Sequence, residues 1–330
     1  MDFTQFATPD FDLEKTLNSG QVFHWEKIDN GFVGTIGDRA VYVEQRGKLL
    51  RVCDGEAQDR SPRRPLRRIV AHYFALDHSL AEICESFPDD PVMNAARDFC
   101  RGLRIIRQPK WECLATFICS SMKQVAHIRE ISAALRKGFG ARRKIDSRVL
   151  HSFPSPHRIA RASENQLREC KLGYRAKNLR ATAQLVSSGK CNLEAWSALP
   201  DDDLRKNLCA LPGVGVKIAN CVLLFAYERL RAFPIDVWIE RVLRQQYFPH
   251  RGKMSAQRLR EFSERYFGEH GGYAQQYLFH HARTALRKSG VPRDFSTALR
   301  SGRDDKRKDA RLISRKTRVS RDLSNARSSP

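Results

Sequence analysis

The 330-residue sequence predicts an α+β fold in which a small antiparallel sheet lobe precedes an all-helical domain. Short runs rich in β-branched and aromatic residues alternate with turn residues between positions 19 and 52, which is typical of an antiparallel meander. From residue 61 onwards apolar residues recur at helical spacing without a further strand pattern. We therefore place a sheet lobe with helices at 1–108, a helical domain at 109–290 and a tail at 291–330.

Four strands are expected in the N-terminal lobe, at 22–25, 32–36, 40–43 and 49–52. The segments between them read Asp-Asn-Gly, Gly-Asp-Arg and Arg-Gly-Lys, and these residue types favour tight turns. Ser61 followed by proline then indicates a helix start, because serine caps helices and proline fits their first turn.

Helical periodicity dominates the rest of the chain. The expected helices lie at 66–74, 80–85, 91–101, 112–121, 125–138, 164–169, 175–187, 193–198, 201–210, 216–228, 237–245, 256–267 and 274–287. The tail after residue 290 is rich in Arg, Lys, Ser and Asp, a composition typical of disorder. This basic tail either adds non-specific DNA affinity or is dispensable.

The charge balance favours a polyanionic partner. Lys and Arg number 59 against 37 Asp and Glu, which gives a net charge of +22. Nucleic acid is favoured over membrane because no basic amphipathic helix with an aromatic face stands out. The nine cysteines contain no C-x-x-C pair, which indicates reduced thiols in an intracellular protein and disfavours zinc and iron–sulfur sites. Export and membrane spanning are disfavoured as well, because the sequence has neither a signal peptide nor an apolar run of ~18 residues.

The most informative stretch runs from Leu208 to Trp238. It holds a Pro-Gly-Val-Gly turn between two helical patterns, and Lys217 follows the second glycine by two residues. Gly213 and Gly215 allow backbone N–H groups to approach a ligand, and the following helix begins with its partial positive end outward. We therefore expect the turn to grip a phosphate group, although not as a nucleoside triphosphate loop, because no Lys-Ser pair follows.

Residues with possible chemistry surround this turn. Lys217, near the positive end of an apolar helix, is disfavoured as a cation and could act as a neutral nucleophile, or it could simply contact phosphate. Asp236 stands at the next helix start, where a capping aspartate is also ordinary. Cys221 lies one helical turn from Lys217, as Phe279 does from Gln275. Gln275 could read a base edge and Phe279 could stack on a base, or both could be ordinary helix residues.

Two loops offer weaker signals. Tyr174 and Arg175 follow a glycine at the tip of a turn, which suits insertion into a duplex. A packed tyrosine beside a surface arginine is the alternative. The Ser-Gly-Gln sequence around Gly20 indicates only a loop before the first strand.

Taken together, these segments resemble the helix-hairpin-helix DNA glycosylases, and among them the 8-oxoguanine DNA glycosylases. The resemblance extends from about Asp12 to Arg287 and lies in six segments that keep one order. They are SGQVFHW at 19–25, ECLATFICSS at 112–121, LGYRAKN at 172–178, LPGVGVKIANC at 211–221, PIDVW at 234–238 and GYAQQYLF at 272–279.

The resemblance implies a role for each matched residue. Lys217 falls on the catalytic lysine, which attacks C1′ of the damaged nucleotide and forms a Schiff base that permits strand cleavage by β-elimination. Asp236 falls on the aspartate that stabilises the developing positive charge on the sugar. Cys221 and Phe279 fall on the residues that sandwich the flipped base, and Gln275 falls on the reader of its Watson–Crick edge.

Lesion recognition is implied at Gly20, which falls on the glycine whose carbonyl accepts a hydrogen bond from N7–H. Oxidation converts N7 of guanine from an acceptor to a donor, so this carbonyl prefers the lesion over guanine. Flipping is required because C1′ is inaccessible while the base is stacked. Tyr174 and Arg175 match the wedge and one contact to the orphaned partner base.

The chain departs from the animal members of the family at two places. Where those members have an asparagine run and an arginine, this chain has Met122, Lys123, Gln124 and His127. These family residues recognise the opposite cytosine, so we predict relaxed selectivity for the opposite base. Trp238 stands where a histidine usually contacts a phosphate.

The resemblance implies a bifunctional 8-oxoguanine glycosylase and AP lyase that acts without metal or cofactor. Its expected partner is double-stranded DNA containing 8-oxoguanine, which a monomer binds through Gly213, Gly215 and Val216 of the hairpin. No membrane partner is expected. The short N-terminus favours a prokaryotic protein in the cytoplasm or nucleoid; a eukaryotic one would be nuclear. The alternatives are a glycosylase of this fold for another damaged base, which the lack of cysteines after Cys221 disfavours if that base is adenine, and a non-catalytic DNA-binding protein, which would leave Lys217 unexplained.

Overall fold

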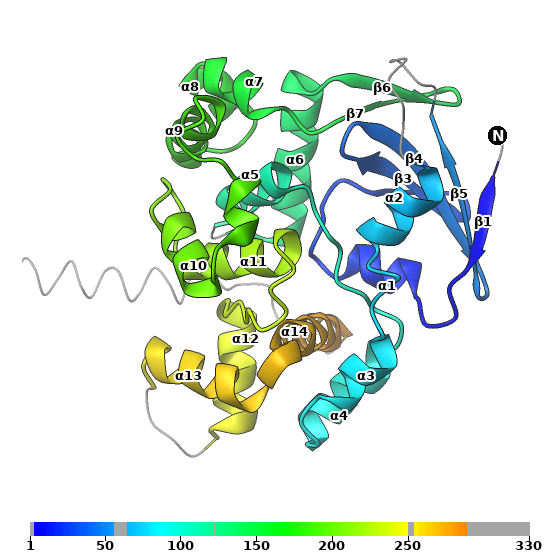
Figure 1. The fold of residues 1–330 in the computed structure, drawn as a ribbon, viewed down its shortest axis with the longest axis vertical. Coiled ribbons are helices and arrows are strands. Elements are labelled where there is room, and N and C mark those ends of the chain that lie inside the picture. Colours follow the sequence, from blue (N-terminus) through cyan, green and yellow to red (C-terminus); the bar gives the residue numbers. More distant parts are fainter. Residues whose placement is uncertain (1–2, 56–64, 122, 250–253, 289–330) are drawn as a thin grey trace, which may run out of the picture. The chain divides into compact units, whose positions relative to one another are not determined.

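The structure, a computed structural model, describes residues 3–55, 65–121, 123–249 and 254–288. Its sheet contains five antiparallel strands in the order β1-β5-β4-β3-β2. The strands are β1 (Thr4–Ala7), β2 (Glu26–Ile28), β3 (Gly31–Ile36), β4 (Arg39–Arg46) and β5 (Leu49–Asp54). Helix α2 (Leu66–Tyr73) contacts β1, β3 and β5 (Figure 1). The predicted fold class, an antiparallel sheet followed by a helical domain, is confirmed.

Three of the four predicted strands are present, and the expected strand at 22–25 is wrong. Those residues belong to neither a strand nor a helix, and Val22, Phe23 and Trp25 among them are buried. The ring of Trp25 lies on Gly34 of β3, where a Cβ would come within 2.6 Å of it, and its indole donates to the Tyr73 hydroxyl. The segment is thus buried by packing on the sheet instead of pairing along its edge.

The further helices described before residue 100 divide between two cores, because the first packs with the sheet and the other two pack with the helical domain. They are α1 (Leu13–Asn18), α3 (Leu80–Glu85) and α4 (Pro91–Phe99). Val43, Leu50 and Val52 of the sheet pack with Phe74 and Ile106, and all five are fully buried. Helix α1 was not predicted, although Asp12 caps it by accepting from Lys15 N at 2.8 Å. The expected helix start at residue 61 lies outside the described residues.

The helical domain is built around α5 (Lys110–Ser120), whose residues from 112 to 120 are all buried. Helix α5 contacts α6, α9 and α11. The other elements are α6 (Val125–Phe139), α7 (Pro156–Arg161), α8 (Glu164–Glu169), α9 (Arg175–Ser187), a 3₁₀ turn (Ala195–Ala198), α10 (Asp201–Cys209), α11 (Val216–Ala226), α12 (Val237–Val242) with a π-helical turn (Leu243–Tyr247), α13 (Ala256–Tyr266), a 3₁₀ turn (Gly268–His270) and α14 (Gly271–Lys288).

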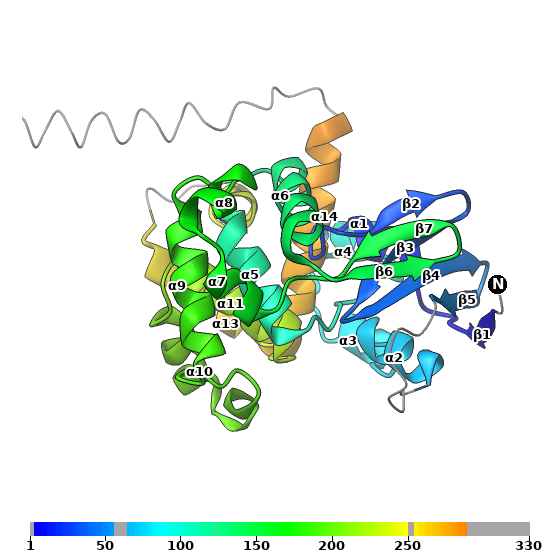
Figure 2. The same cartoon turned by 90° about the horizontal axis from the view of Figure 1, so that it is seen from above.

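The expectation that no strand follows residue 61 is wrong. Strands β6 (Arg142–Ile145) and β7 (Arg148–His151) form a hairpin that contacts β4 and β3 (Figure 2). Its apolar signal is weak because Ile145 is its one buried residue, packed with Val33, Ala40 and Cys53 of the sheet. The three residues before Ile145, which are Arg142, Arg143 and Lys144, are basic, so β6 shows no apolar alternation.

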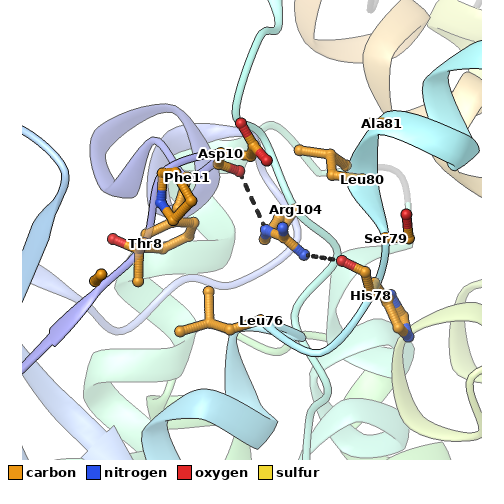
Figure 3. Close-up of a pocket in the computed structure, with 11 residues that line it drawn as sticks. Thr8, Asp10, Phe11, Leu76, His78, Ser79, Leu80, Ala81 and Arg104 are labelled. Carbon is orange, nitrogen blue, oxygen red and sulfur yellow. Dashed lines mark hydrogen bonds between the residues drawn. The ribbon is translucent and has the colours of Figure 1, made fainter.

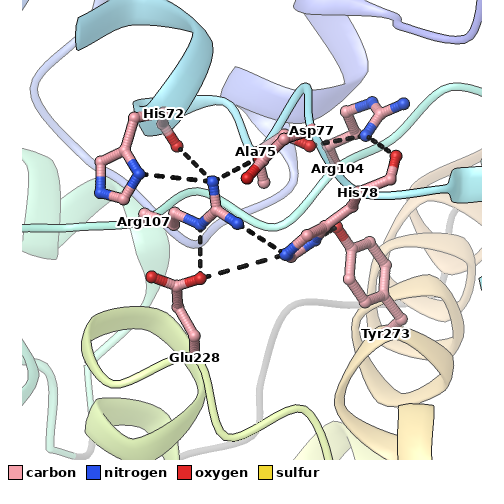
Figure 4. Close-up of polar contacts among 8 residues, drawn as sticks. All are labelled: His72, Ala75, Asp77, His78, Arg104, Arg107, Glu228 and Tyr273. Atoms are coloured by element: carbon pink, nitrogen blue, oxygen red, sulfur yellow. Dashed lines mark hydrogen bonds and ion pairs between the residues drawn. The ribbon is translucent and has the colours of Figure 1, made fainter. Parts of the chain in front are cut away.

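A polar network joins the two parts of the fold (Figure 4). Arg107, which precedes α5, donates to Glu228 Oε2 at 2.6 Å and to Asp77 Oδ1 at 2.5 Å. Its Nη2 lies 2.8 Å from His78 Nε2, and His78 Nδ1 lies 2.9 Å from the hydroxyl of Tyr273 in α14. Burial lowers the pKa of His78, and the Arg107 charge lowers it further. The network therefore links the loop after α2 to the residues that follow α11 and to the start of α14.

A cavity of 220 Å³ lies beside this network, between the end of β1 and the start of α3 (Figure 3). Arg104 lines it and donates to the carbonyls of Asp10 at 3.3 Å, Ala75 at 2.6 Å and His78 at 2.9 Å. Ala75 and His78 belong to the same connection between α2 and α3, so the buried guanidinium links that connection to the loop at Asp10.

Residues 1–284 form one compact unit, so the domain boundary at 108/109 stays a prediction. The predicted tail at 291–330 lies outside the described residues. Among the helices that the structure describes, none combines the length and apolar character that crossing a bilayer requires.

Candidate active site

The turn between α10 and α11 presents the start of α11. Gly213 has a φ of +82° and faces Asn178 of α9, where a Cβ would lie 2.8 Å from the asparagine, so only glycine fits. Gly215 is the N-cap of α11, and a Cβ there would meet open space. Val216, the first residue of the helix, is 41 % exposed. The N–H groups of the first turn are therefore accessible to an anion such as a phosphate.

Lys217 lies in this first turn, and its side chain extends over an aromatic ring. Its Nζ lies 5.2 Å from the ring centre of Phe117, a buried residue of α5. That ring is stacked on Phe225 with centroids 5.6 Å apart and planes 8° apart. Burial raises the pKa of the Cys221 thiol, and the charge of Lys217 together with its hydrogen bond to the thiol opposes that rise. The amine thus lies between an aromatic face and a buried thiol.

Asp236 caps α12 and also belongs to this neighbourhood. Its Oδ1 accepts a hydrogen bond from Ile239 N at 2.9 Å. Burial raises the pKa of the carboxyl, and the nearby charge of Lys217 is the largest effect opposing that rise. The structure therefore brings Lys217, Cys221 and Asp236 close enough to interact, and their roles stay predictions.

Two of the residues expected to hold a base, Gln275 and Phe279, lie one turn apart on α14. Gln275 is 5 % exposed, and its Oε1 is buried without a hydrogen-bond partner among the described residues. A Cβ on Gly20 would lie 3.1 Å from the Phe279 ring and 2.7 Å from Arg283 Nη1, so the Gly20 backbone lies against this helix. Because buried amide oxygens nearly always find a partner, the unpaired oxygen of Gln275 favours a ligand at this place.

Tyr174 and Arg175 lie at the start of α9 in different environments. Tyr174 is 60 % exposed, as a wedge would be. Arg175 is 6 % exposed, donates from Nε to the Ser121 carbonyl at 2.8 Å, and lies 4.3 Å from the Tyr174 ring centre. The guanidinium is buried and binds the carbonyl that ends α5. Its contact with an orphaned base therefore stays a prediction.

The remaining DNA contacts also stay predictions. His127 is exposed in the first turn of α6, and Trp238 is half-buried in the first turn of α12. Met122 lies outside the described residues.

Sequence reasoning missed Phe117, Gln276 and Arg283. Phe117 belongs to the matched segment at 112–121 but looks like any apolar residue of a buried helix. Gln276 follows Gln275 on α14 and Arg283 lies one turn beyond Phe279, and their spacing alone does not indicate what they contact.

No group of three or more His, Cys, Asp or Glu side chains in the described part of the chain could hold a metal ion. All nine cysteines are free thiols.

The chain is similar to known proteins along most of its length. The family model for the N-terminal domain of 8-oxoguanine DNA glycosylase matches residues 4–114, and the model for HhH-GPD superfamily base excision DNA repair proteins matches residues 115–266. A probable N-glycosylase/DNA lyase of Methanothermobacter thermautotrophicus is 30 % identical over 83 % of this chain and 94 % of its own. An N-glycosylase/DNA lyase of Arabidopsis thaliana is 31 % identical over 81 % of this chain and 76 % of its own. The structure of Clostridium acetobutylicum 8-oxoguanine glycosylase/lyase with dsDNA containing cytosine opposite 8-oxoG has a TM-score of 0.78 at 27 % identity, covering 87 % of this chain and 100 % of that one.

Proposed function

The chain belongs to the 8-oxoguanine DNA glycosylase/lyases of the HhH-GPD superfamily, and from this premise we propose that its substrate is 8-oxoguanine in duplex DNA. It is a DNA-binding glycosylase with lyase activity. Two observations on one helix support the proposed substrate, the contact of the Gly20 backbone with Phe279 and the unpaired buried oxygen of Gln275 one turn earlier on α14. Monomeric action on intracellular DNA is part of the same proposal.

Lesion recognition follows from this pocket. The carbonyl of Gly20 would accept the N7–H of 8-oxoguanine, while N7 of guanine would face it as a second acceptor. Cys221 and Phe279 would bound the two faces of the base, and Gln275 would pair with its Watson–Crick edge. A site built around such hydrogen bonds rejects an analogue that leaves its buried polar groups unpaired.

The proposed chemistry uses Lys217 at the start of α11 and Asp236 at the start of α12. The Lys217 amine attacks C1′ as the base leaves, and loss of a proton with opening of the sugar ring gives a Schiff base from which β-elimination cleaves the strand. Asp236, fixed by its bond to Ile239 N, places a carboxylate where positive charge develops on the sugar. The first turn of α11 would meanwhile bind a DNA phosphate through backbone N–H groups.

Borohydride trapping tests this chemistry. The wild type should form a covalent adduct with an 8-oxoguanine duplex, and Lys217→Gln should form none because the amide cannot make a Schiff base. Retention of duplex binding and of Tm by Lys217→Gln would show that the variant is folded. If the wild type forms no adduct, the proposed mechanism is wrong.

A second experiment addresses the base opposite the lesion. Met122, Lys123, Gln124 and His127 replace the residues that read cytosine in the animal enzymes, so excision opposite A, G and T should stay within about tenfold of the rate opposite C, a difference of ~1.4 kcal/mol. Single-turnover rates on four duplexes that differ only at this base decide the question. A preference for cytosine as strong as that of the animal enzymes would contradict the prediction.

A further inference from the structure

Side chains hold the segment Asn18–Gln21 by its backbone carbonyls. Arg283 Nη2 donates to the Asn18 carbonyl, and Gln276 Nε2 donates to the Ser19 carbonyl at 3.1 Å. Gln108 Nε2 donates to the Gln21 carbonyl at 2.8 Å. Gly20 supplies the one carbonyl of the four to which no group in the described residues donates.

Gly20 is also the residue of this segment that could not be replaced without strain. Its φ of +90° lies in the region that favours glycine, and a Cβ would come 2.7 Å from Arg283 Nη1. The backbone of Gly20 is therefore confined on one side by Arg283 while its carbonyl remains available as an acceptor.

The two donors from α14 lie on one face of that helix. Gln276 and Arg283 are seven residues apart, which is about two helical turns. Gln276 is 3 % exposed and Arg283 is 9 % exposed. Because a buried amide or guanidinium is costly without its hydrogen bonds, both side chains are held in place by the carbonyls that they bind.

These donors alternate along α14 with the residues expected to hold the base. Gln276 follows Gln275, and Arg283 lies one turn beyond Phe279, with its guanidinium carbon 5.3 Å from the Phe279 ring centre. The Arg283 guanidinium thus contacts both the Phe279 ring, which is expected to stack on the base, and the backbone at Gly20. A displacement of Arg283 would move both of these parts of the expected base pocket.

We propose that Gln276 and Arg283 are positioning residues for lesion recognition, because they fix the Gly20 carbonyl where it must accept N7–H. This inference rests on the proposed function. Neither side chain needs to touch the reacting atoms. Preference for the lesion requires an immobile acceptor, since a carbonyl that can turn away would neither bind N7–H firmly nor repel N7 of guanine.

The test compares two substrates that share every step except base recognition. One is a duplex with 8-oxoguanine, and the other is the same duplex with a preformed abasic site, which offers no base to Gly20. Single-turnover excision and strand cleavage are measured for Arg283→Met, Arg283→Lys and Gln276→Met. Thr284→Ala is the matched control, because among the described residues the Thr284 hydroxyl bonds only to the His280 carbonyl of the same helix, at 2.8 Å.

We expect Arg283→Met and Gln276→Met to slow 8-oxoguanine excision about tenfold, or ~1.4 kcal/mol, with abasic-site cleavage within about twofold. Arg283→Lys should recover part of the loss, because its ammonium can still donate to the Asn18 carbonyl. Thr284→Ala should change neither rate. A variant with an unchanged excision rate, or an equal fall on both substrates, would overturn the inference. Failure of the wild type to excise 8-oxoguanine would instead refute the proposed function.

Discussion

Replacement of His280 by glutamine should make the protein more resistant to acid. His280 is 7 % exposed, and its Nδ1 is buried without a partner among the described residues. Burial, and then the charge of Arg283, lower its pKa from 6.5 to about 4. The folded protein therefore keeps this imidazole neutral between these values, whereas the unfolded chain takes up a proton. Such a group lowers the free energy of unfolding as the pH falls from 6.5, the pKa in the unfolded chain, towards the pKa in the folded protein.

The expected size follows from proton linkage. Between pH 7 and pH 5 a shift from 6.5 to about 4 removes about 2 kcal/mol of folding free energy, and partial access of water reduces this to about 1 to 2 kcal/mol. For a domain of this size that corresponds to a fall in Tm of about 3 to 6 °C. Glutamine cannot titrate, so the variant should lack this part of the acid-induced loss.

The assay is thermal unfolding at pH 7, 6 and 5, followed by circular dichroism. The quantity compared is the fall in Tm between pH 7 and 5, which cancels the constant cost of the substitution and the other titrating groups. His157→Gln is the control, because an exposed imidazole meets water in both states. If His280→Gln loses as much Tm as the wild type over this range, the histidine is not held neutral and our reasoning is refuted.

Three further substitutions give separate expectations. Gly20→Ala places a Cβ 2.7 Å from Arg283 at a φ of +90° and should lower single-turnover 8-oxoguanine excision more than about tenfold, with a smaller loss on abasic DNA. Asp236→Asn keeps a capping oxygen for Ile239 N but removes the charge, so Tm should stay within about 2 °C while borohydride trapping slows about a hundredfold. Arg107→Met should lower the free energy of unfolding in urea by about 2 kcal/mol, because it removes the link to Glu228; an unchanged urea midpoint would contradict this.

Local signals predicted the helical domain well. The bounds of α8 and α9 agree with the predicted 164–169 and 175–187. Helix α8 begins with a capping box in which Ser163 and Gln166 exchange hydrogen bonds, a device that two side chains within four residues of sequence specify. The hairpin of β6 and β7 was missed because burial of Ile145 depends on contacts with a sheet about a hundred residues earlier.

The same division between local and distant contacts holds in the site. The spacing of Lys217 and Cys221 is helical, so their proximity could be predicted from the chain alone. The bond from Gln276 to Ser19 spans 257 residues and that from Arg283 to Asn18 spans 265. Nothing in the local spacing of α14 indicates which carbonyls its side chains will find, so the positioning contacts became visible only in the folded chain.

Asp236 shows why a structural role and a chemical role need not compete. Its bond to Ile239 N is that of an ordinary helix cap, the alternative that sequence spacing left open. Backbone N–H groups of Ile239 and Trp238 both donate to the carboxylate, and these bonds fix its position at the start of α12. Burial raises its pKa, and the charge of Lys217 is the largest effect that favours the ionised form. A capped carboxylate beside a lysine is therefore preorganised to stabilise positive charge on a substrate, since it need not reorient when that charge develops.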